Sequence, residues 1–476
     1  MKNKHQNRLC DIGMIGLGVM GRNLLLNMRD HGFTVAGFDT DKNKVDSLQH
    51  ESSGNNVYGA TNINDFIDLL KIPRAIMLLV PAGQAVDNVI NELVPQLQQK
   101  DLIVDAGNSH FTDTDRRLKY LNEKNISFLG IGISGGERGA RRGPSIMPGG
   151  SRESYKRIQG ILEAVAAKVD DQPCVTYLGV GSVGHYVKMV HNGIEYGIMQ
   201  LIAETYDVMK RGLLLNQAEL SAVYAEWNNT HIESYLLEIT SHIFRQKDDK
   251  TNKPLIDEIL AVAKQNGTGM WTSLSSMELQ SPTPTIDIAV TMRDLSVFID
   301  ERDAVSQLYH QPINKIKMDK SVFLHQLQHA FYAAMMMVYA QGLSLLSVAS
   351  SRYSYELNVE DVASIWRGGC IIRAKCLEDI GMAYRNNSTL KNILLDENVS
   401  QKIMQHQQAL RQVIGEVMNT GIPIPAFMSA LGYFDAMKSK WLPANLIQAQ
   451  RDYFGSHTYE RVDEKGVFHT EWQNGG

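Results

Sequence analysis

The stretch Asp11-Ile-Gly-Met-Ile-Gly16-Leu-Gly18-Val-Met-Gly21 decides the fold of the first part of this chain. The apolar run Asp11–Leu17 is typical of a buried strand, and Gly21–His31 has the pattern of a helix. Between them the glycines have G-x-G-x-x-G spacing, in the strand–helix context that a dinucleotide-binding turn requires. The first glycine permits the tight turn, the second lets a pyrophosphate approach the backbone, and the third lets the helix pack on the strand. The alternative reading is an ordinary strand–helix turn.

An acidic residue follows the second predicted strand, Thr34–Phe38. Asp39 lies 18 residues after Gly21, close to the position of the acid that holds the adenosine ribose in such folds. A carboxylate here accepts hydrogen bonds from the ribose 2′-hydroxyl and repels a 2′-phosphate. The alternative is that Asp39 caps a helix or a turn.

Strand and helix patterns alternate over the first part of the chain, which predicts a parallel α/β sheet. The further predicted strands are Ala75–Val80, Leu102–Asp105 and Ser127–Gly132. Long helical patterns then replace the strands, over His185–Arg211, Lys320–Ser350 and Gln401–Asn419. We therefore expect an α/β Rossmann domain over residues 1–182, a large all-helical domain over 183–440 and a C-terminal tail over 441–476.

Composition narrows the class of protein. Of 476 residues, 43% are hydrophobic and 21% charged, which fits a globular chain and argues against long disorder. A net charge of −5 gives no general attraction to nucleic acid or to an anionic membrane. The four cysteines form no metal-like pair and indicate free thiols in a reducing compartment. With neither a signal-like N-terminus nor an uninterrupted apolar span, the prediction is a cytoplasmic protein without a membrane segment.

Four polar residues recur at helical spacing in the first long helix. Lys188, His191, Asn192 and Glu195 stand at offsets of 0, 3, 4 and 7 and share one helix face. A solvated face with a Lys–Glu pair is the plain alternative. The apolar neighbours of these residues favour a buried helix, whose polar face would form the wall of a cleft.

Six motifs, in order along the chain, resemble those of the 6-phosphogluconate dehydrogenase family. They are Gly16–Gly21, Asp105-Ala-Gly-Asn-Ser109, Ser134-Gly-Gly136, Lys188-Met-Val-His-Asn-Gly-Ile-Glu195, Trp366-Arg-Gly-Gly-Cys-Ile-Ile-Arg373 and Arg451-Asp-Tyr-Phe-Gly-Ser-His457. The resemblance implies a Rossmann domain, a helical domain and a tail that reaches the partner's active site in a homodimer. It also implies a pentose phosphate pathway reaction: oxidative decarboxylation of 6-phosphogluconate to ribulose 5-phosphate and CO₂, with reduction of NAD(P).

The resemblance assigns the two proton-handling roles to Lys188 and Glu195. Lys188 would act as base toward the substrate hydroxyl and then as acid toward the keto oxygen, and Glu195 would protonate the carbon that loses CO₂. A lysine can act as a base only if burial or a nearby positive charge lowers its pKa. This scheme requires no metal, and the sequence shows no convincing metal-ligating cluster.

The resemblance also implies the binding residues. For the cofactor these are Gly16, Gly18, Val19, Met20, Gly21, Asp39, Val80, Ala82 and Asn108. For the substrate they are Asn108, Ser134, Gly135, Gly136, His191, Asn192, Tyr196, Arg293 and, from the partner subunit, Arg451 and His457. For Ser134-Gly-Gly136 the alternative is a tight turn chosen for its glycines. Arg293 or Arg451 taken alone would more often be a surface or salt-bridged residue. Arginine suits the phosphate because its planar fork donates two hydrogen bonds.

This chain departs from the family pattern at both ends of the expected site. Asp39-Thr40-Asp41 stands where NADP-using members place Asn-Arg-Thr, and Pro81 stands where many have a lysine. Both changes remove positive charge near the adenosine, so we expect a preference for NAD, although Lys42 and Lys44 could compensate.

At the substrate end, Asn266 and Met270 replace two lysines, which predicts weaker binding of 6-phosphogluconate or a related substrate. Two other functions stay open at this point. One is a related β-hydroxyacid dehydrogenase acting on another sugar acid such as gluconate, and the other is a cofactor-binding homologue without turnover.

Overall fold

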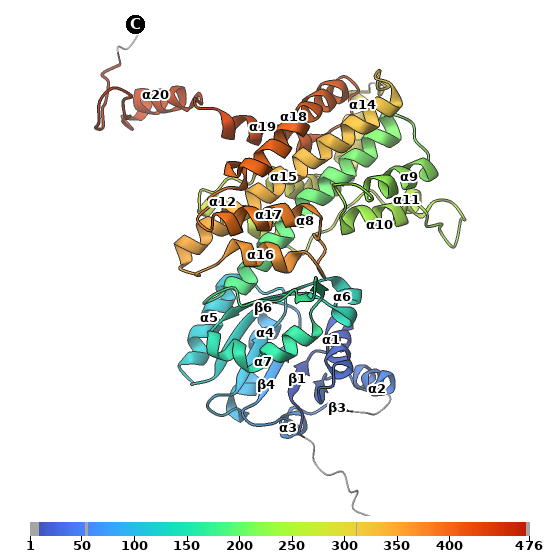
Figure 1. Ribbon diagram of the computed structural model, residues 1–476, viewed down its shortest axis with the longest axis vertical. Coiled ribbons are helices and arrows are strands. Elements are labelled where there is room, and N and C mark those ends of the chain that lie inside the picture. Colours follow the sequence, from blue (N-terminus) through green and yellow to red (C-terminus); the bar gives the residue numbers. More distant parts are fainter. Residues whose placement is uncertain (1–8, 53–55, 311, 473–476) are drawn as a thin grey trace, which may run out of the picture. The chain divides into compact units, whose positions relative to one another are not determined.

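The computed structural model describes residues 9–52, 56–310 and 312–472 (Figure 1). Its contacts divide the chain into two compact units, Met1–Ala430 and Leu431–Gly476. The first unit contains both the sheet and the long helices, as the sequence predicted for an α/β part followed by a helical part. The predicted domain boundaries after residues 182 and 440 stay predictions.

A seven-stranded sheet forms the base of the first unit. Its strands are β1 (Ile12–Ile15), β2 (Val35–Phe38), β3 (Val57–Ala60), β4 (Ala75–Leu78), β5 (Leu102–Asp105), β6 (Ser127–Ser134) and β7 (Ser145–Gly150). They lie in the order β3-β2-β1-β4-β5-β6-β7, with β1 to β6 parallel and β7 antiparallel to β6. The parallel α/β prediction is confirmed. β3 and β7 were not predicted, because β3 has half-exposed residues and β7 ends in Pro148-Gly-Gly.

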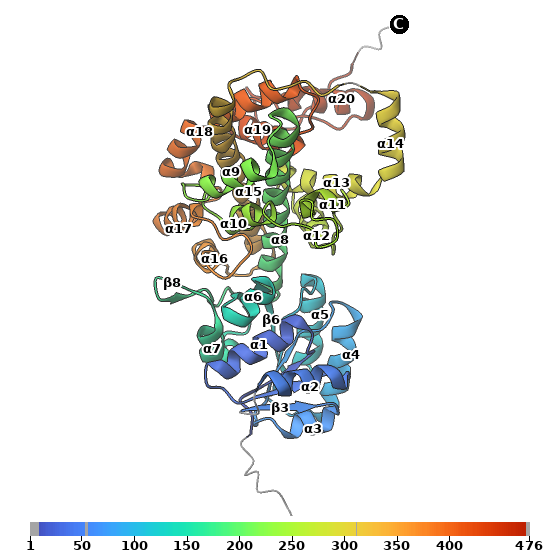
Figure 2. The same ribbon diagram turned by 90° about the vertical axis from the view of Figure 1, so that its right-hand side faces the viewer.

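Helices cover both faces of this sheet (Figure 2). They are α1 (Val19–Asp30), α2 (Lys42–Glu51), α3 (Ile63–Asp68), α4 (Gln84–Leu93), α5 (Phe111–Asn122), α6 (Gly136–Arg142) and α7 (Arg152–Val165), with a 3₁₀ turn at Val94–Gln96. Successive strand residues point to opposite faces. Accordingly Ile12 and Met14 of β1 pack with α1 and α7, whereas Ile15 packs with α3 and α4. Burial on both faces explains the nearly continuous apolar runs of these strands.

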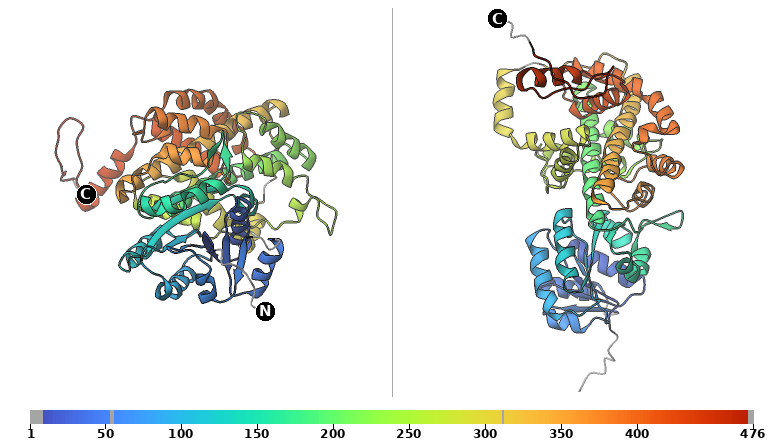
Figure 3. Two further views of the ribbon diagram at one scale, coloured as in Figure 1. Left: turned by 60° about the horizontal axis from the view of Figure 1, so that its bottom comes forward. Right: turned by 90° about the vertical axis from the view of Figure 1, so that its left-hand side faces the viewer.

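After a two-stranded ribbon, β8 (Lys168–Val169) and β9 (Gln172–Pro173), the chain becomes helical. The helices are α8 (Val183–Asp207, followed by a π turn at Val208–Gly212), α9 (Gln217–Trp227), α10 (Tyr235–Ile243), α11 (Leu255–Glu258), α12 (Thr268–Glu278), α13 (Pro284–Val297), α14 (Ile299–Leu308), α15 (Lys320–Tyr353), α16 (Val359–Trp366), α17 (Cys376–Asn386), a 3₁₀ turn at Ile393–Leu395, α18 (Glu397–Met418) and α19 (Pro425–Lys438). The long helix α15 packs against both α8 and α18 (Figure 3).

The α8 helix connects the sheet to the helical part because glycines let its first turns approach β6 and β7 closely. A Cβ on Gly132 of β6 would lie 2.3 Å from Cβ of Lys188, and a Cβ on Gly184 would lie 2.3 Å from the Gly130 carbonyl oxygen. Real Cβ atoms do not tolerate such distances. This contact fixes where the polar face of α8 begins.

The α15 helix is long and apolar enough to cross a membrane, with a mean hydropathy of 1.4 over an 18-residue window. However, 83% of that window is buried inside the protein, where α15 packs on α8 and α18. Its composition is therefore that of a core helix.

The second unit contains the end of α19, α20 (Ala444–Gly455) and the strand-like segments that follow. Asp452 is its buried centre. The Asp452 carboxylate accepts hydrogen bonds from Thr458 N, Thr470 N and Trp472 Nε1 at 2.9, 3.1 and 2.9 Å, and lies 2.8 Å from His469 Nδ1. Burial acts to raise the pKa of Asp452, but these contacts hold it at about 2. One carboxylate thus organises the fold of the tail.

Candidate active site

One cleft of the first unit gathers side chains from the sheet part and the helical part, with a volume of ≈ 590 Å³. The predicted site residues that line it are Ala82, Asn108, Lys188, Asn192, Glu195, Tyr196 and Arg293. Pro81, Lys264, Gln265, Asn266, Thr268 and Trp271 complete its wall. The cleft therefore contains the predicted amine and carboxyl groups together with a loop from the expected cofactor end.

The polar face of α8 supplies both of these groups. Lys188 is only 7% exposed and lies beside β6, where Gly132 leaves room for it. Burial lowers the pKa of the Lys188 ammonium, against the opposing influence of Glu195 and of Cys370. Among the described residues, no carboxylate lies within ion-pair distance of Lys188. A lysine held in this way is easier to deprotonate than one in water, as a general base must be.

Glu195 lies two turns further along the same face. Burial raises the pKa of its carboxyl group, although the positive charges of Lys188 and Arg293 oppose this effect. A carboxyl group with a raised pKa keeps its proton to higher pH and can donate it to a reacting carbon. The two shifts bring the pKa values of the amine and the carboxyl group closer together, which suits opposite roles in proton transfer.

His191 lies behind the cleft and is fully buried. Its Nε2 is 3.1 Å from Ser134 Oγ, and its Nδ1 is 3.2 Å from Asn192 Oδ1. Burial and then the nearby Lys188 charge hold the pKa of His191 well below its ordinary value, so its ring is neutral at pH 7. The ring therefore connects the end of β6 to the Asn192 amide in the cleft wall. The predicted substrate contacts of Ser134 and His191 stay predictions.

The two glycines after Ser134 form a tight turn into α6. Gly135 and Gly136 have φ values of +127° and +61°, which strongly favour glycine. A Cβ on Gly135 would lie 2.4 Å from the carbonyl oxygen of Gly369. Gly135 lines a separate cavity of ≈ 180 Å³ together with Arg138 and Arg373. The alternative reading of a turn chosen for its glycines is thus supported, and the substrate role of these two residues stays a prediction.

Arg293 of α13 supplies a positive charge at the far end of the cleft. Its guanidinium carbon lies 3.3 Å from the centre of the Tyr196 ring, in a cation–π contact. Within the described ranges Arg293 has no acidic ion-pair partner, and its polar contacts include Met199 Sδ at 3.6 Å and the Tyr196 side chain. The stacked guanidinium keeps its in-plane donors available for an anion.

The loop before α12 brings a second cation, Lys264, which sequence reasoning missed. On either side of it, Ala263 N donates to Ser296 Oγ at 3.0 Å and Gln265 Nε2 donates to Asp294 at 2.5 Å. Both acceptors belong to α13, the helix of Arg293. These contacts hold the residues on either side of Lys264 against α13, and Lys264 and Arg293 line the same cleft. The family pattern has a lysine at the position of Asn266. The sequence signal that could have found Lys264 was a lysine only two positions before it.

The glycine-rich turn has the geometry that the motif predicted. Gly16 has φ +96°, and a Cβ on Gly21 would lie 1.9 Å from the Gly16 carbonyl oxygen. A Cβ on Gly18 would meet nothing within 4 Å, so the turn is open there. Val19 and Met20 begin α1, and no side chain caps its first N–H groups. The turn therefore has both space and donors for a pyrophosphate.

Asp39 sits at the end of β2, almost buried, and holds this turn in place. Its carboxylate accepts from Leu17 N at 2.9 Å and Asp41 N at 3.0 Å, and lies 3.2 Å from Lys44 Nζ. Burial acts to raise the pKa of Asp39, but these three partners outweigh burial and lower it. The carboxylate is ionised and serves as a turn cap as well as a candidate ribose acceptor, so both readings of Asp39 stand together.

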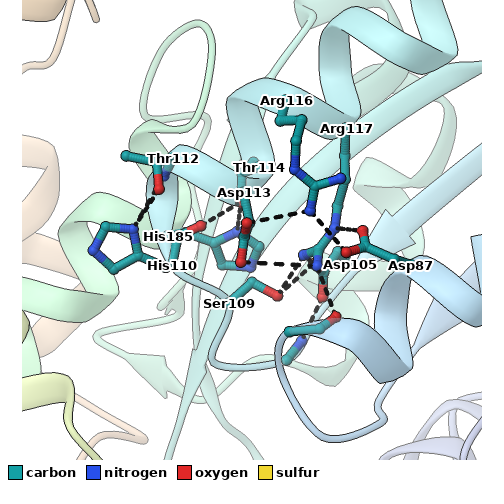
Figure 4. Close-up of polar contacts among 12 residues, drawn as sticks. Asp87, Asp105, Ser109, His110, Thr112, Asp113, Thr114, Arg116, Arg117 and His185 are labelled. Atoms are coloured by element: carbon teal, nitrogen blue, oxygen red, sulfur yellow. Dashed lines mark hydrogen bonds and ion pairs between the residues drawn. The ribbon is translucent and has the colours of Figure 1, made fainter.

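Two loops that carry predicted cofactor residues are tied together by buried Arg117 (Figure 4). Arg117 donates to Asp105 and Ser109, which flank Asn108, at 3.1 and 3.0 Å. It also donates to the Gly83 carbonyl at 2.9 Å and to Asp87 at 2.7 Å. Gly83 follows the Val80–Ala82 segment and precedes α4. Sequence reasoning missed Arg117, since nothing in the local pattern of α5 distinguishes it from its neighbour Arg116.

Arg451 and His457 belong to the second unit, where both are exposed. Arg451 donates to Gln448 Oε1 at 3.0 Å on the same helix. Their predicted role in a partner's site stays a prediction.

Comparison with known proteins adds an independent line of support. Two family models match: the NAD binding domain of 6-phosphogluconate dehydrogenase over residues 11–179, and the 6-phosphogluconate dehydrogenase C-terminal domain over residues 184–472. The chain is 47% identical over 462 residues to the NADP(+)-dependent, decarboxylating 6-phosphogluconate dehydrogenase of Bacillus subtilis, covering 97% of this chain and 98% of the relative. It is 46% identical over 462 residues to the decarboxylating enzyme of Escherichia coli K12, with the same coverage.

A solved structure leads to the same family. Plasmodium falciparum 6-phosphogluconate dehydrogenase, studied with its cofactor NADP+ and its substrate 6-phosphogluconate, matches with a TM-score of 0.94 and 43% identity. The match covers 97% of this chain and 100% of the other. The motif-based resemblance is therefore confirmed, and the chain belongs to the 6-phosphogluconate dehydrogenase family.

Proposed function

We propose that this protein oxidises and decarboxylates 6-phosphogluconate to ribulose 5-phosphate and CO₂, with a nicotinamide dinucleotide as hydride acceptor. The observation that carries the proposal is the shared helix face that presents Lys188 and Glu195 to one cleft, with their pKa values shifted toward each other. The names of the relatives specify this reaction for those proteins. They do not favour the alternatives of another sugar acid or a non-catalytic homologue.

The proposed chemistry uses these two residues in sequence. A nicotinamide bound near Ala82 and Asn108 supplies the hydride acceptor. The neutral Lys188 amine removes the proton of the substrate hydroxyl as the hydride leaves its carbon. The resulting Lys188 ammonium then donates that proton to the keto oxygen. As the bond to CO₂ breaks, its electron pair forms the carbon–carbon double bond of the enediol, and the protonated oxygen becomes a hydroxyl. Glu195 donates its proton to the carbon that has lost CO₂ while the Lys188 amine takes back the proton of the enediol oxygen, so that the enediol becomes the ketose.

Arg293 and Lys264 are the proposed phosphate ligands of this chain. Arg293 offers a guanidinium stacked on Tyr196, and Lys264 lines the same cleft on a loop whose neighbouring residues contact α13. Lys264 then offsets the charge that Asn266 no longer provides. We therefore expect the loss of the lysine at Asn266 to weaken 6-phosphogluconate binding only slightly.

The choice between NAD and NADP depends on Asp39. Its ionised carboxylate and the absence of an arginine at Thr40 favour NAD, whereas Lys44 next to Asp39 reduces the local negative charge. The Bacillus subtilis relative is named as NADP-dependent and the Plasmodium falciparum enzyme has NADP+ as its cofactor, so neither supports an NAD preference. We keep the NAD preference as a proposal that cofactor kinetics must decide.

We also propose a cytoplasmic location and a homodimer in which the tails are exchanged. The tail exchange is tested by co-expressing Lys188→Met chains with Arg451→Ala chains. Each variant alone is expected to be inactive, but a mixed dimer has one site with an intact lysine and an intact partner tail. Activity should return to about a quarter of wild type. No recovery in verified mixed dimers would contradict tail exchange.

The proposed reaction itself is tested by absorbance of the reduced nicotinamide, with 6-phosphogluconate and each cofactor in turn. Wild-type protein should turn over and release CO₂, and Lys188→Met should lose about 10²- to 10⁴-fold in turnover. A wild-type protein that reduces neither cofactor with 6-phosphogluconate would overturn the proposal.

A further inference from the structure

Four histidines from three separate segments meet in the helical part, away from the cleft residues. His231 lies in the turn between α9 and α10, His325 and His329 lie on α15, and His406 lies on α18. One ring nitrogen from each of His231, His329 and His406 falls within a group no wider than 4.8 Å. Because these residues are 98 and 77 positions apart along the chain, their spacing predicted no metal site.

Ring nitrogens of the cluster point at one another, and one of them has no hydrogen-bond partner among the described residues. His329 Nδ1 lies 2.5 Å from His406 Nδ1, so these two ring nitrogens point at each other. His231 Nε2 is buried and, among the described residues, has no hydrogen-bond partner. Unpartnered buried polar atoms are rare in folded proteins and call for an explanation such as an ion.

The protonation state also suits a metal. Burial lowers the pKa of His231 and of His329, and burial together with the neighbouring histidines lowers the pKa of His406 to about 4. The rings are therefore neutral near pH 7, which is the form that coordinates a metal ion.

We propose that His231, His329 and His406 form a binding site for a divalent transition metal ion of the zinc class. Three imidazole nitrogens without a carboxylate favour zinc, copper or nickel over magnesium or calcium. Tetrahedral zinc with bonds of about 2.0–2.1 Å needs its nitrogens about 3.4 Å apart. The His329–His406 pair must therefore open by about 0.9 Å, and nitrogens of the group that are up to 4.8 Å apart must close by up to about 1.4 Å.

His325 would orient the central ligand. Its Nε2 lies 3.0 Å from Nε2 of His329. If His329 coordinates the metal through Nδ1, its Nε2–H can donate to His325, and such a partner fixes the tautomer and orientation of the ring. Tyr332 packs edge-on against His231 and His406, with ring centres at 5.1 and 4.6 Å, and helps to limit their motion.

The positive charges of nearby lysines limit the affinity of this site for a metal cation. Lys375 and Lys402 both act on His231 and oppose a further positive charge. Lys402 is bound to Asp379 at 2.6 Å, which neutralises much of its effect. We therefore expect reversible binding that connects the His231 turn, α15 and α18.

The test uses untagged full-length protein, stripped with a chelator and titrated with zinc by calorimetry, with bound metal counted by elemental analysis. One ion per chain is expected in the wild type and in His242→Gln, a control at an exposed histidine of α10. The double variant His329→Gln/His406→Gln should bind none. All three proteins should turn over equally, because the histidines do not line the catalytic cleft. Absence of binding in the wild type, or equal binding in the double variant, would overturn the proposal.

Cobalt spectroscopy keeps the proposal testable if the double variant does not fold. Cobalt-loaded wild type should show the visible bands of a nitrogen-ligated site without the charge-transfer absorption of cysteine thiolates. The single variant His231→Gln should weaken these bands. Thiolate absorption, or bands unchanged in His231→Gln, would place the metal elsewhere and contradict the site.

Discussion

The two ends of the predicted site, a nucleotide end at the glycine-rich turn and a substrate end at the cleft, are built in different ways. At the nucleotide end, glycines within Gly16–Gly21 shape the backbone, and a missing Cβ provides the space. At the substrate end, charged side chains meet from segments far apart in the chain, namely Lys188 and Glu195 of α8, the Lys264 loop and Arg293 of α13. The nucleotide end can be recognised from the eleven residues Asp11–Gly21 alone. The substrate end forms only when the helices that carry its side chains pack together. Substitutions should therefore affect the two ends in different measurable quantities.

The largest effect on stability is expected at the nucleotide end, from Arg117→Met. Arg117 is 1% exposed, and its removal leaves Asp105 buried without its charge partner. Breaking such a buried pair costs about 3–5 kcal/mol. Denaturant unfolding should show this loss, and the KM for the cofactor should rise.

Arg116→Met is the matched control for that comparison. Arg116 pairs with Asp87 and Asp113, but its side chain is 55% exposed. Its removal should cost at most about 1 kcal/mol. Equal stability loss in the two variants would mean that Arg117 does not organise the cofactor loops in the way described.

A smaller effect on substrate binding is expected at the other end, from Lys264→Ala. Lys264 is an exposed residue of the cleft wall, so loss of its charge should raise the KM for 6-phosphogluconate by about tenfold, with kcat and thermal stability nearly unchanged. The reverse change, Asn266→Lys, should lower the KM. Initial rates for unphosphorylated gluconate serve as the control, because neither substitution should alter them. An unchanged KM in Lys264→Ala would show that this lysine does not meet the phosphate.

The smallest effect is expected from Asp39→Asn, which keeps an acceptor for Leu17 N and removes the charge. The ratio of kcat/KM for NADP to that for NAD should rise by about fivefold. Steady-state rates with both cofactors measure it. A ratio that does not move would indicate that Asp39 acts only as the cap of the glycine-rich turn.

Sequence reasoning succeeded where one segment carries the signal. β5 was predicted with its observed bounds, Leu102–Asp105, and α15 was predicted from its correct first residue, Lys320. The shared helix face of Lys188 and Glu195 could also be read from spacing alone. Weak or glycine-rich strands such as β3 and β7 were missed, because edge position and antiparallel pairing are decided by neighbours rather than by the local pattern.

The missed functional residues share a different cause. Lys264, Arg117 and the histidine cluster gain their roles from partners that are distant in the chain. Lys264 depends on α13, Arg117 on the Asp105 and Gly83 loops, and His329 on α18. No pattern of spacing within one element marks such residues, and only the folded structure brings their partners together.

The central claim is that Lys188 serves the oxidation and Glu195 serves the later protonation of carbon. Stopped-flow absorbance of Glu195→Gln with 6-phosphogluconate measures both steps in one trace. We expect Glu195→Gln to show a rapid first turnover that forms one reduced nicotinamide per site, followed by steady turnover slowed about 10²- to 10⁴-fold. Lys188→Met should show no rapid phase. Wild-type steady turnover in Glu195→Gln, or loss of its rapid phase, would contradict this division of roles.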